Sequence, residues 1–311
     1  FNIKINELYN TIDDRYFQEG NNINQFLIDS HNFYKLLFSD LEKYLPHEGK
    51  LIFTIDSYLK NIPISTLYDG NQYLVEKYSI VMTLGGKIPK SKPLSKNNLR
   101  VLFGGLVSEN HSSFKEDKIR NLRLKWKALS YVEYENKFVK RYTKYVVELL
   151  EKNFTQRNFK NKLVLSDFPI VHVATHGYFS SNPENTFIAA SDELLELQEI
   201  EQLIRLRHDG TYNSINLLVL SACETAKSDR IGNLGMAGIA TQAGAKSTLA
   251  TLWKVQDDST ADLIGEFYKA LSREKTDKAE SLRQAQISLI HSEKYNHPYY
   301  WGAFVFAGNW L

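Results

Sequence analysis

Two stretches decide the fold: Ile170-Val171-His172-Val173-Ala174-Thr175-His176-Gly177 and Ile215-Asn216-Leu217-Leu218-Val219-Leu220-Ser221-Ala222-Cys223. Each is an apolar run of strand length, which is typical of strands in a parallel sheet that helices cover on both faces. Each run also ends in a side chain that can transfer a proton or attack a carbonyl group. The sequence therefore predicts two buried parallel strands with chemistry at their ends.

The spacing of the two strand ends favours a common site. His176 and Cys223 are 47 residues apart, which accommodates a loop, a short strand and a crossover helix between neighbouring parallel strands. Neighbouring strands lie about 4.8 Å apart, and functional groups of open α/β sheets gather at the carboxyl ends of the strands. We expect His176 and Cys223 to share a proton there.

A thiol needs help to act as a nucleophile at neutral pH. Its ordinary pKa is about 8.5, so a histidine that accepts its proton activates it. Gly177 leaves room for a carbonyl group, and the amides of Gly177 and Cys223 can form an oxyanion hole. This set predicts acyl transfer. The alternative is that Cys223 is a small buried residue and His176 a turn residue.

His172 is the competing candidate for the base. It falls in the middle of the first run, where its side chain should point into the packing of the sheet. We expect it to make core hydrogen bonds and take no part in catalysis.

The rest of the chain alternates strand and helix patterns, which predicts an α/β fold with a mostly parallel sheet and helices on both faces. Short apolar runs predict strands at residues 51–55, 79–83, 101–106, 186–190 and 247–255. Helical spacing predicts helices at residues 24–45, at 130–152 behind a capping-box pattern, at 197–204, and from about Ser259 and Asp277 onward.

Composition narrows the function further. The 311 residues hold 38 Lys and Arg against 36 Asp and Glu, a net charge of +2. That balance gives no reason to expect nucleic acid or a membrane as partner. The single cysteine excludes a disulfide within the chain and Cys-cluster metal sites. We expect a cytoplasmic protein without a metal or cofactor, and the start at Phe1 suggests a fragment of a longer chain.

The two stretches, extended to Glu224-Thr225, resemble the signature of CHAT-domain proteases, which are caspase-like relatives of separase in clan CD. The similarity covers about residues 51–311. It continues through Gly232-Asn233-Leu234-Gly235-Met236-Ala237-Gly238, Ala243-Gly244-Ala245-Lys246-Ser247, Leu249-Ala250-Thr251-Leu252-Trp253-Lys254-Val255 and Pro298-Tyr299-Tyr300-Trp301-Gly302-Ala303-Phe304.

The resemblance implies a cysteine endopeptidase with His176 as general base and Cys223 as nucleophile, acting through a thioester. It implies a caspase-like fold in two halves: a pseudo-protease half at 49–155 and an active half at 156–311, after an N-terminal helical segment at 1–48 joined to an upstream domain. It also implies a protein substrate and an activating partner or upstream sensor, such as a helical-repeat domain or a bacterial antiviral defence complex. We expect that partner to order residues 226–232.

Some positions depart from the family pattern. Gln256 replaces the first of two aspartates that usually follow the tryptophan-containing strand, and Asp257 keeps the second. Ser221 stands where relatives specific for basic residues often carry Asp, so a basic P1 residue is not supported unless Asp192 or Asp257 supplies the charge. Glu224 either orders the loop beside the nucleophile or stabilises a helix start.

Two other functions are weighed against proteolysis. The first is a catalytically silent scaffold that keeps the fold for protein binding. The second is a nucleotide-binding module built on the glycines at 232, 235, 238 and 244. Their spacing fits no phosphate-binding motif, which favours close packing of a small-residue helix. Asp257, Asp258 and Asp262 are interpreted as helix-start carboxylates, not as a cation site.

Overall fold

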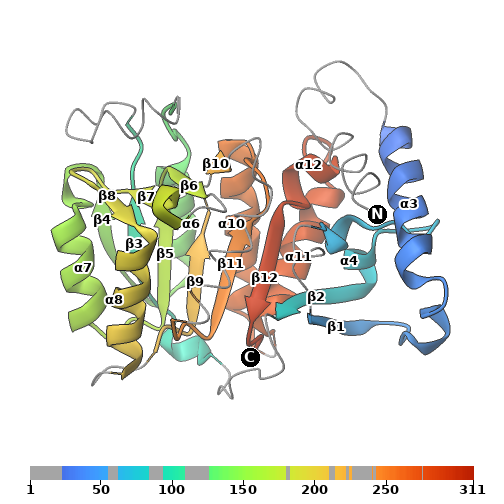
Figure 1. Cartoon of the computed structure of the whole chain (residues 1–311), viewed down its shortest axis with the longest axis horizontal. Helices are drawn as coiled ribbons and strands as arrows, with labels where there is room; N and C mark the ends of the chain where they lie inside the picture. Colours follow the sequence, from blue (N-terminus) through green and yellow to red (C-terminus); the bar gives the residue numbers. More distant parts are fainter. Residues whose placement is uncertain are drawn as a thin grey trace.

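The computed structural model describes residues 23–54, 62–83, 94–108, 126–179, 183–209, 214–221, 224–225, 240, 243–274 and 276–311. An eight-stranded sheet forms its centre (Figure 1). In chain order its strands are β1 (Gly49–Thr54), β2 (Tyr78–Thr83), β3 (Arg100–Gly105), β4 (Tyr145–Leu150), β5 (Ile170–Ala174), β9 (Leu217–Leu220), β11 (Ser247–Thr251) and β12 (Phe304–Gly308). The sheet confirms the predicted fold class.

The order across the sheet is β1-β2-β12-β11-β9-β5-β3-β4. All neighbouring pairs are parallel except β11 and β12, so the sheet consists of two blocks that run in opposite directions. The middle strands β12, β11, β9 and β5 are buried along their whole length, whereas the edge strands β1 and β4 are partly exposed. The apolar runs of the sequence therefore lie where both faces of the sheet are covered.

Helices cover the two faces of this sheet. On one face, α6 (Val132–Tyr142) and α11 (Lys278–Ile290) both pack against α10 (Asp257–Leu271), and α7 (Gln156–Leu165) and α8 (Leu197–Asp209) pack together on the other (Figure 1). α3 (Ile23–Phe38) lies beside the β1 edge. The remaining helices are short: α4 (Leu74–Lys77), α12 (Pro298–Trp301) and the 3₁₀ helices Glu42–Tyr44, Ile64–Thr66, Lys96–Asn98, Glu151–Asn153 and Pro183–Asn185.

A second, four-stranded sheet follows the carboxyl ends of β5 and β9. It has the order β10-β6-β7-β8 and consists of β6 (Gly177–Phe179), β7 (Phe187–Ala189), β8 (Leu194–Glu196) and β10 (Glu224–Thr225). β6 begins three residues after β5 ends, and β10 begins four residues after β9 ends. The chain thus passes from the large sheet into the small one twice, and the residues at both passages are those that the sequence singled out.

The predicted helix at 130–152 is wrong in its second half. α6 ends at Tyr142, and Tyr145-Val146-Val147 begins β4, because aromatic and β-branched residues suit a strand that pairs along its full length with β3. The predicted capping box is absent as well. The backbone N–H of Tyr131, the residue that precedes the helix, donates to Asp257 Oδ2 at 2.7 Å.

The predicted helix at 24–45 is also too long. α3 ends at Phe38, and the 3₁₀ helix Glu42–Tyr44 follows it. Leu41 and Tyr44, which continued the helical spacing, are exposed. The helical spacing of apolar residues therefore continues past the end of the buried helix.

The predicted division at residue 156 stays a prediction. Strands from both sides of that position pair within the one large sheet: β4 and β3 come before it, and β5 comes after it. β12 joins the two blocks of the sheet, and Gly308 at its end has a φ of 96°, with the carbonyl oxygen of Lys246 close against the position where a Cβ would stand. A side chain there would collide with backbone, so the junction requires glycine.

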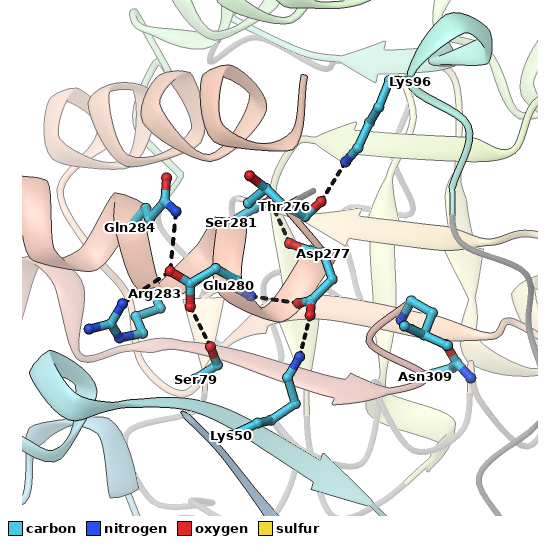
Figure 2. A network of polar contacts seen from close by, with 11 residues as sticks. Lys50, Ser79, Lys96, Thr276, Asp277, Glu280, Ser281, Arg283, Gln284 and Asn309 are labelled. Atoms are coloured by element: carbon cyan, nitrogen blue, oxygen red, sulfur yellow. Dashed lines mark hydrogen bonds and ion pairs between the residues drawn. The ribbon is translucent and has the colours of Figure 1, made fainter. Parts of the chain in front are cut away.

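A polar network ties α11 to the sheet near the starts of β9 and β11 (Figure 2). Asp277 precedes α11, and its Oδ1 accepts the Glu280 amide at 2.8 Å, while its other oxygen pairs with Lys50 of β1. Glu280 Oε2 accepts the Ser79 hydroxyl of β2 at 2.6 Å. Next to them Lys278 donates to Asn216 Oδ1 at 2.6 Å, and burial lowers the pKa of this lysine to about 7.

Candidate active site

β5 and β9 lie side by side and run parallel, as the sequence predicted (Figure 1). Their register pairs Val173 with Leu220, and beyond the last pair the Ser221 amide donates to Val173 O at 3.2 Å. His176 stands in the short link between β5 and β6. The first of the two predicted catalytic residues therefore lies at the carboxyl end of a central strand.

Cys223 lies outside the described residues, and so does the glycine-rich stretch 226–239. Residues on either side of Cys223 are described. Ser221 is bonded to Val173, and Glu224 pairs with Tyr178 in the parallel ladder between β10 and β6. The chain that flanks the cysteine in sequence is thus bonded to the chain that flanks His176, and the dyad stays a prediction.

His176 itself is 4% exposed. The indole of Trp126 stacks on its imidazole, with ring centroids 5.0 Å apart and an angle of 1° between the planes. The carbonyl of His176 accepts the Ala189 amide at 2.8 Å, and the hydroxyl of Thr175 donates to Ala189 O at 2.8 Å. β7 therefore fixes the backbone on which the imidazole is mounted.

His172 is fully buried in the middle of β5, on the face covered by α6 and α10. Its Nε2 lies 2.6 Å from Glu135 Oε1 and 3.2 Å from Ser221 Oγ, and its Nδ1 lies 3.1 Å from the hydroxyl of Tyr268. Burial, and then the charge of Glu135, raise the pKa of Tyr268 well above its ordinary value. The hydroxyl therefore keeps its proton and can donate to Nδ1.

Because Tyr268 can donate to Nδ1, Nε2 is left to share the hydrogen bond with Ser221 Oγ, and the Glu135 carboxylate lies beside it. The prediction that His172 makes core hydrogen bonds is confirmed. Sequence reasoning missed Glu135, which is 2% exposed. The signal was its spacing, because Glu135 falls between Val132 and Val139 on the buried stripe of α6.

Three of the four residues predicted to line a substrate pocket or order its loop have described side chains. Ser221 is buried and faces His172, as given above. Asp192 Oδ1 accepts the Gln156 amide at 2.7 Å, at the start of α7. Asp257 accepts the Tyr131 amide. Nothing is described for the side chain of Glu224. Their role toward a substrate stays a prediction.

Asp257 has an unusual environment for a helix-start carboxylate. Burial raises its pKa to about 6, the hydrogen bond from Tyr131 opposes that shift, and the nearby charge of Glu135 adds to it. α10 does begin at Asp257 and Asp258, as the sequence predicted. Asp258 accepts the amide of Ser259, whereas Asp257 serves the neighbouring helix α6.

The described residues hold no group of three or more His, Cys, Asp or Glu side chains arranged to bind a metal ion. Among the same residues no helix has the length and apolar character to cross a membrane.

Thirty-one chains of solved structures match the fold of this chain. One is the Arg-specific cysteine proteinase gingipain R, with a TM-score of 0.54 at 10% identity, over 93% of this chain and 68% of that one. Another is the complex of the pro- and mature domains of RgpB from Porphyromonas gingivalis, with a TM-score of 0.45 at 10% identity, over 69% of this chain. This chain spans only 48% of the length of that second structure.

The gingipain match shows a caspase-like fold, and at this identity it shows the fold alone. No curated protein matches the sequence. The sequence model of the CHAT domain matches residues 28–309, nearly the whole chain. The chain therefore belongs to the CHAT domain family.

Proposed function

We propose that this chain is a cysteine endopeptidase in which Cys223 is the nucleophile and His176 the general base. One observation carries the proposal: the residues on both sides of Cys223 are bonded to the residues on both sides of His176. Ser221 bonds to Val173, and Glu224 pairs with Tyr178. One short segment links β5 to β6, and another links β9 to β10. Because the two segments start beside each other and end beside each other, we expect His176 and Cys223 to reach the same substrate.

The reaction needs only groups of the chain. Cys223 transfers its proton to His176, and its sulfur attacks the carbonyl carbon of the substrate, whose oxygen becomes an oxyanion held by the amides of Gly177 and Cys223. The carbon–nitrogen bond breaks, and the leaving amine takes the proton from His176, which leaves a thioester. His176 then removes a proton from water, the hydroxide attacks the thioester, and the thiol is released with its proton. No metal or cofactor takes part.

Gly177 suits the oxyanion hole for a structural reason. It is the first residue of β6 and pairs with Ile188 in the antiparallel ladder with β7. Its backbone is therefore held by a sheet, and it carries no side chain to obstruct the approach of a carbonyl oxygen. A donor with a fixed position is what stabilises charge in a transition state.

We further propose that a regulatory protein or an upstream sensor domain controls the enzyme, in the cytoplasm and in bacterial antiviral defence. The polar, glycine-flanked composition of residues 226–232 supports this control, because such loops close over a site when a partner orders them. These residues lie outside the described part of the chain. Full activity of the purified chain that no added partner changes would contradict this part.

The enzyme and the silent scaffold separate on treatment with a peptide electrophile that reacts with thiols. Because Cys223 is the one cysteine of the sequence, mass spectrometry of the intact protein reports labelling at that residue. We expect labelling that is lost in His176→Ala and kept in His172→Phe variants that still fold. Labelling that depends on His172 and not on His176 would show that His172 is the base and that the proposal names the wrong histidine. Slow labelling that depends on neither would favour the scaffold.

The substrate is found by mapping new protein termini in cells that express the wild-type protein or the Cys223→Ala variant. Cuts that appear with the wild type alone give both the substrate and the residue before the cut. A nucleotide titration serves as a separate check on the glycine-rich segment, because ligand binding raises the melting temperature. We expect no rise.

A further inference from the structure

We infer that Trp126 is a positioning residue for His176, which holds the plane of the imidazole. The inference rests on the proposed function, because a fixed imidazole matters to the reaction only if His176 transfers protons. It goes beyond that function by assigning a role to a residue outside the two strand ends. Trp126 lies before α6, 50 residues ahead of His176 in sequence.

The stacking geometry is close to parallel. The two planes differ by 1°, and the centroids are 5.0 Å apart, a separation that fits an offset stack. The ring nitrogens of an imidazole exchange protons within the plane of the ring. A flat partner on one face therefore restricts rotation of the ring and leaves the nitrogens at the edge of the stack.

Aromatic side chains of the small sheet support Trp126 in turn. Phe187 of β7 meets the indole edge-on, with centroids 6.5 Å apart at 62°. Phe187 stacks on Tyr178 of β6 at 5.8 Å and 25°, and the two residues are also partners in the strand ladder. The orientation of Trp126 is thus set by the small sheet independently of His176, which is what a positioning residue requires.

The backbone near Trp126 is anchored as well. Three residues on, the Leu129 amide donates to Val107 O at 2.9 Å, just past the end of β3. The Val107 amide donates to Glu151 Oε1 at 2.6 Å, and the Ser108 hydroxyl donates to Glu151 Oε2 at 2.8 Å. Glu151 has a φ of 51°, a left-handed conformation that persists in a non-glycine residue only when its surroundings impose it. The contacts run from Glu151 to the strand end and on to the segment that carries Trp126.

The test measures how fast a peptide electrophile labels Cys223 in Trp126→Ala and Trp126→Phe. The labelling rate is separated into the rate constant of the covalent step, kinact, and the constant for binding of the electrophile, KI. We expect Trp126→Ala to lower kinact by about tenfold or more, because small misplacement of a catalytic group costs that much. KI should stay within about twofold. Trp126→Phe keeps a flat ring and should recover most of the rate. Trp310→Phe is the matched control, because Trp310 is also partly buried but lies beside Lys50 in the polar network at the start of α11.

A spectroscopic measurement tests the contact without catalysis. A protonated imidazole quenches an indole that it touches, so the fluorescence of the wild type minus that of Trp126→Phe should titrate with pH, and this titration should vanish in a His176→Gln background. Trp126→Ala that labels at the wild-type rate would overturn the inference, and so would faster labelling, which would make Trp126 a cover over the site. If the wild type itself is not labelled while the fluorescence titration is present, the proposed function fails and the contact stands.

Discussion

The two ends of the central strands use polar side chains in different ways. Around the start of α11, near the start of β9, polar side chains pair with one another: Asp277 with Lys50 and Glu280 with Ser79 (Figure 2), and Lys278 with Asn216. At the ends of β5 and β9, His176 instead packs on an aromatic ring. The first arrangement ties elements of the fold together, and the second fixes the plane of an imidazole ring. Open α/β sheets typically carry their function at the carboxyl ends of the strands.

The largest effect should come from the carboxyl end of β5. His176→Gln keeps a polar side chain of similar length but cannot act as a base, so we expect labelling of Cys223 to fall by about 10²- to 10⁴-fold. The midpoint of urea unfolding should change little. If His176→Gln unfolds at a lower urea concentration but labels at the wild-type rate while folded, His176 is a structural residue. The contrast between the two ends of the central strands would then be wrong.

The next effect tests the buried network beneath that end. Glu135→Ala removes the carboxylate that lies 2.6 Å from Nε2 of His172 and leaves only Ser221 Oγ beside that nitrogen, and we expect the loss of a charged partner to cost about 1–3 kcal/mol in free energy of unfolding. Urea unfolding followed by circular dichroism measures it. Glu133→Ala is the control, because Glu133 lies on the exposed side of the same helix. Equal losses in the two variants would show that the network contributes nothing.

The polar network at the start of α11 should give a smaller effect on stability and none on chemistry. Asp277→Ala removes the helix cap and the partner of Lys50, which together cost about 1–2 kcal/mol. Asp277→Asn keeps a capping oxygen and should recover part of the loss. The labelling rate of the folded protein should match the wild type in both variants. A reduced rate would mean that the two ends of the strands are coupled.

The last effect is a pH dependence at Asp257. Its pKa is raised to about 6 in the folded chain, above the ordinary 3.8, so the protonated form is favoured by folding. The stability that this group contributes is present below about pH 4 and lost as the pH rises through about 6. Relative to the wild type, Asp257→Asn should therefore gain free energy of unfolding between pH 4 and pH 7.

Asp258→Asn provides the contrast for that experiment. Burial alone would raise the pKa of Asp258, but hydrogen bonds from Lys294 and Tyr295 outweigh it and lower the pKa. Its contribution is lost as the pH falls below the ordinary value, so this variant should show no relative gain between pH 4 and pH 7. A constant difference between Asp257→Asn and the wild type would show that the carboxyl of Asp257 is not perturbed by burial.

The strands next to the candidate site could be predicted because their sequence is sufficient. The apolar runs that became β5 and β9 are buried on both faces, and nothing in them competes with a strand. The helix prediction for residues 143–150 was wrong for the opposite reason. Helical spacing continued past Tyr142 by coincidence, and only the pairing of β4 with β3 made the segment a strand. Such pairing depends on residues far away in sequence.

The sequence singles out the two candidate catalytic residues, but it gives no sign of the side chains around them. His176 and Cys223 stand out because each follows a strand pattern and carries a reactive group. Trp126 and Glu135 gave no such signal, because their importance comes from contacts with His176 and His172 across the fold. A side chain that acts through a neighbour is recognised only when the neighbour is known.

The place of β12 has a consequence for how the molecule is made. It comes last along the chain among the described strands, yet it lies between β2 and β11 and is the strand that joins the two blocks of the sheet. During translation, the other seven described strands of this sheet leave the ribosome before β12 does. The nascent polypeptide therefore cannot join the two blocks of the sheet until β12 has emerged, however early the other strands pair.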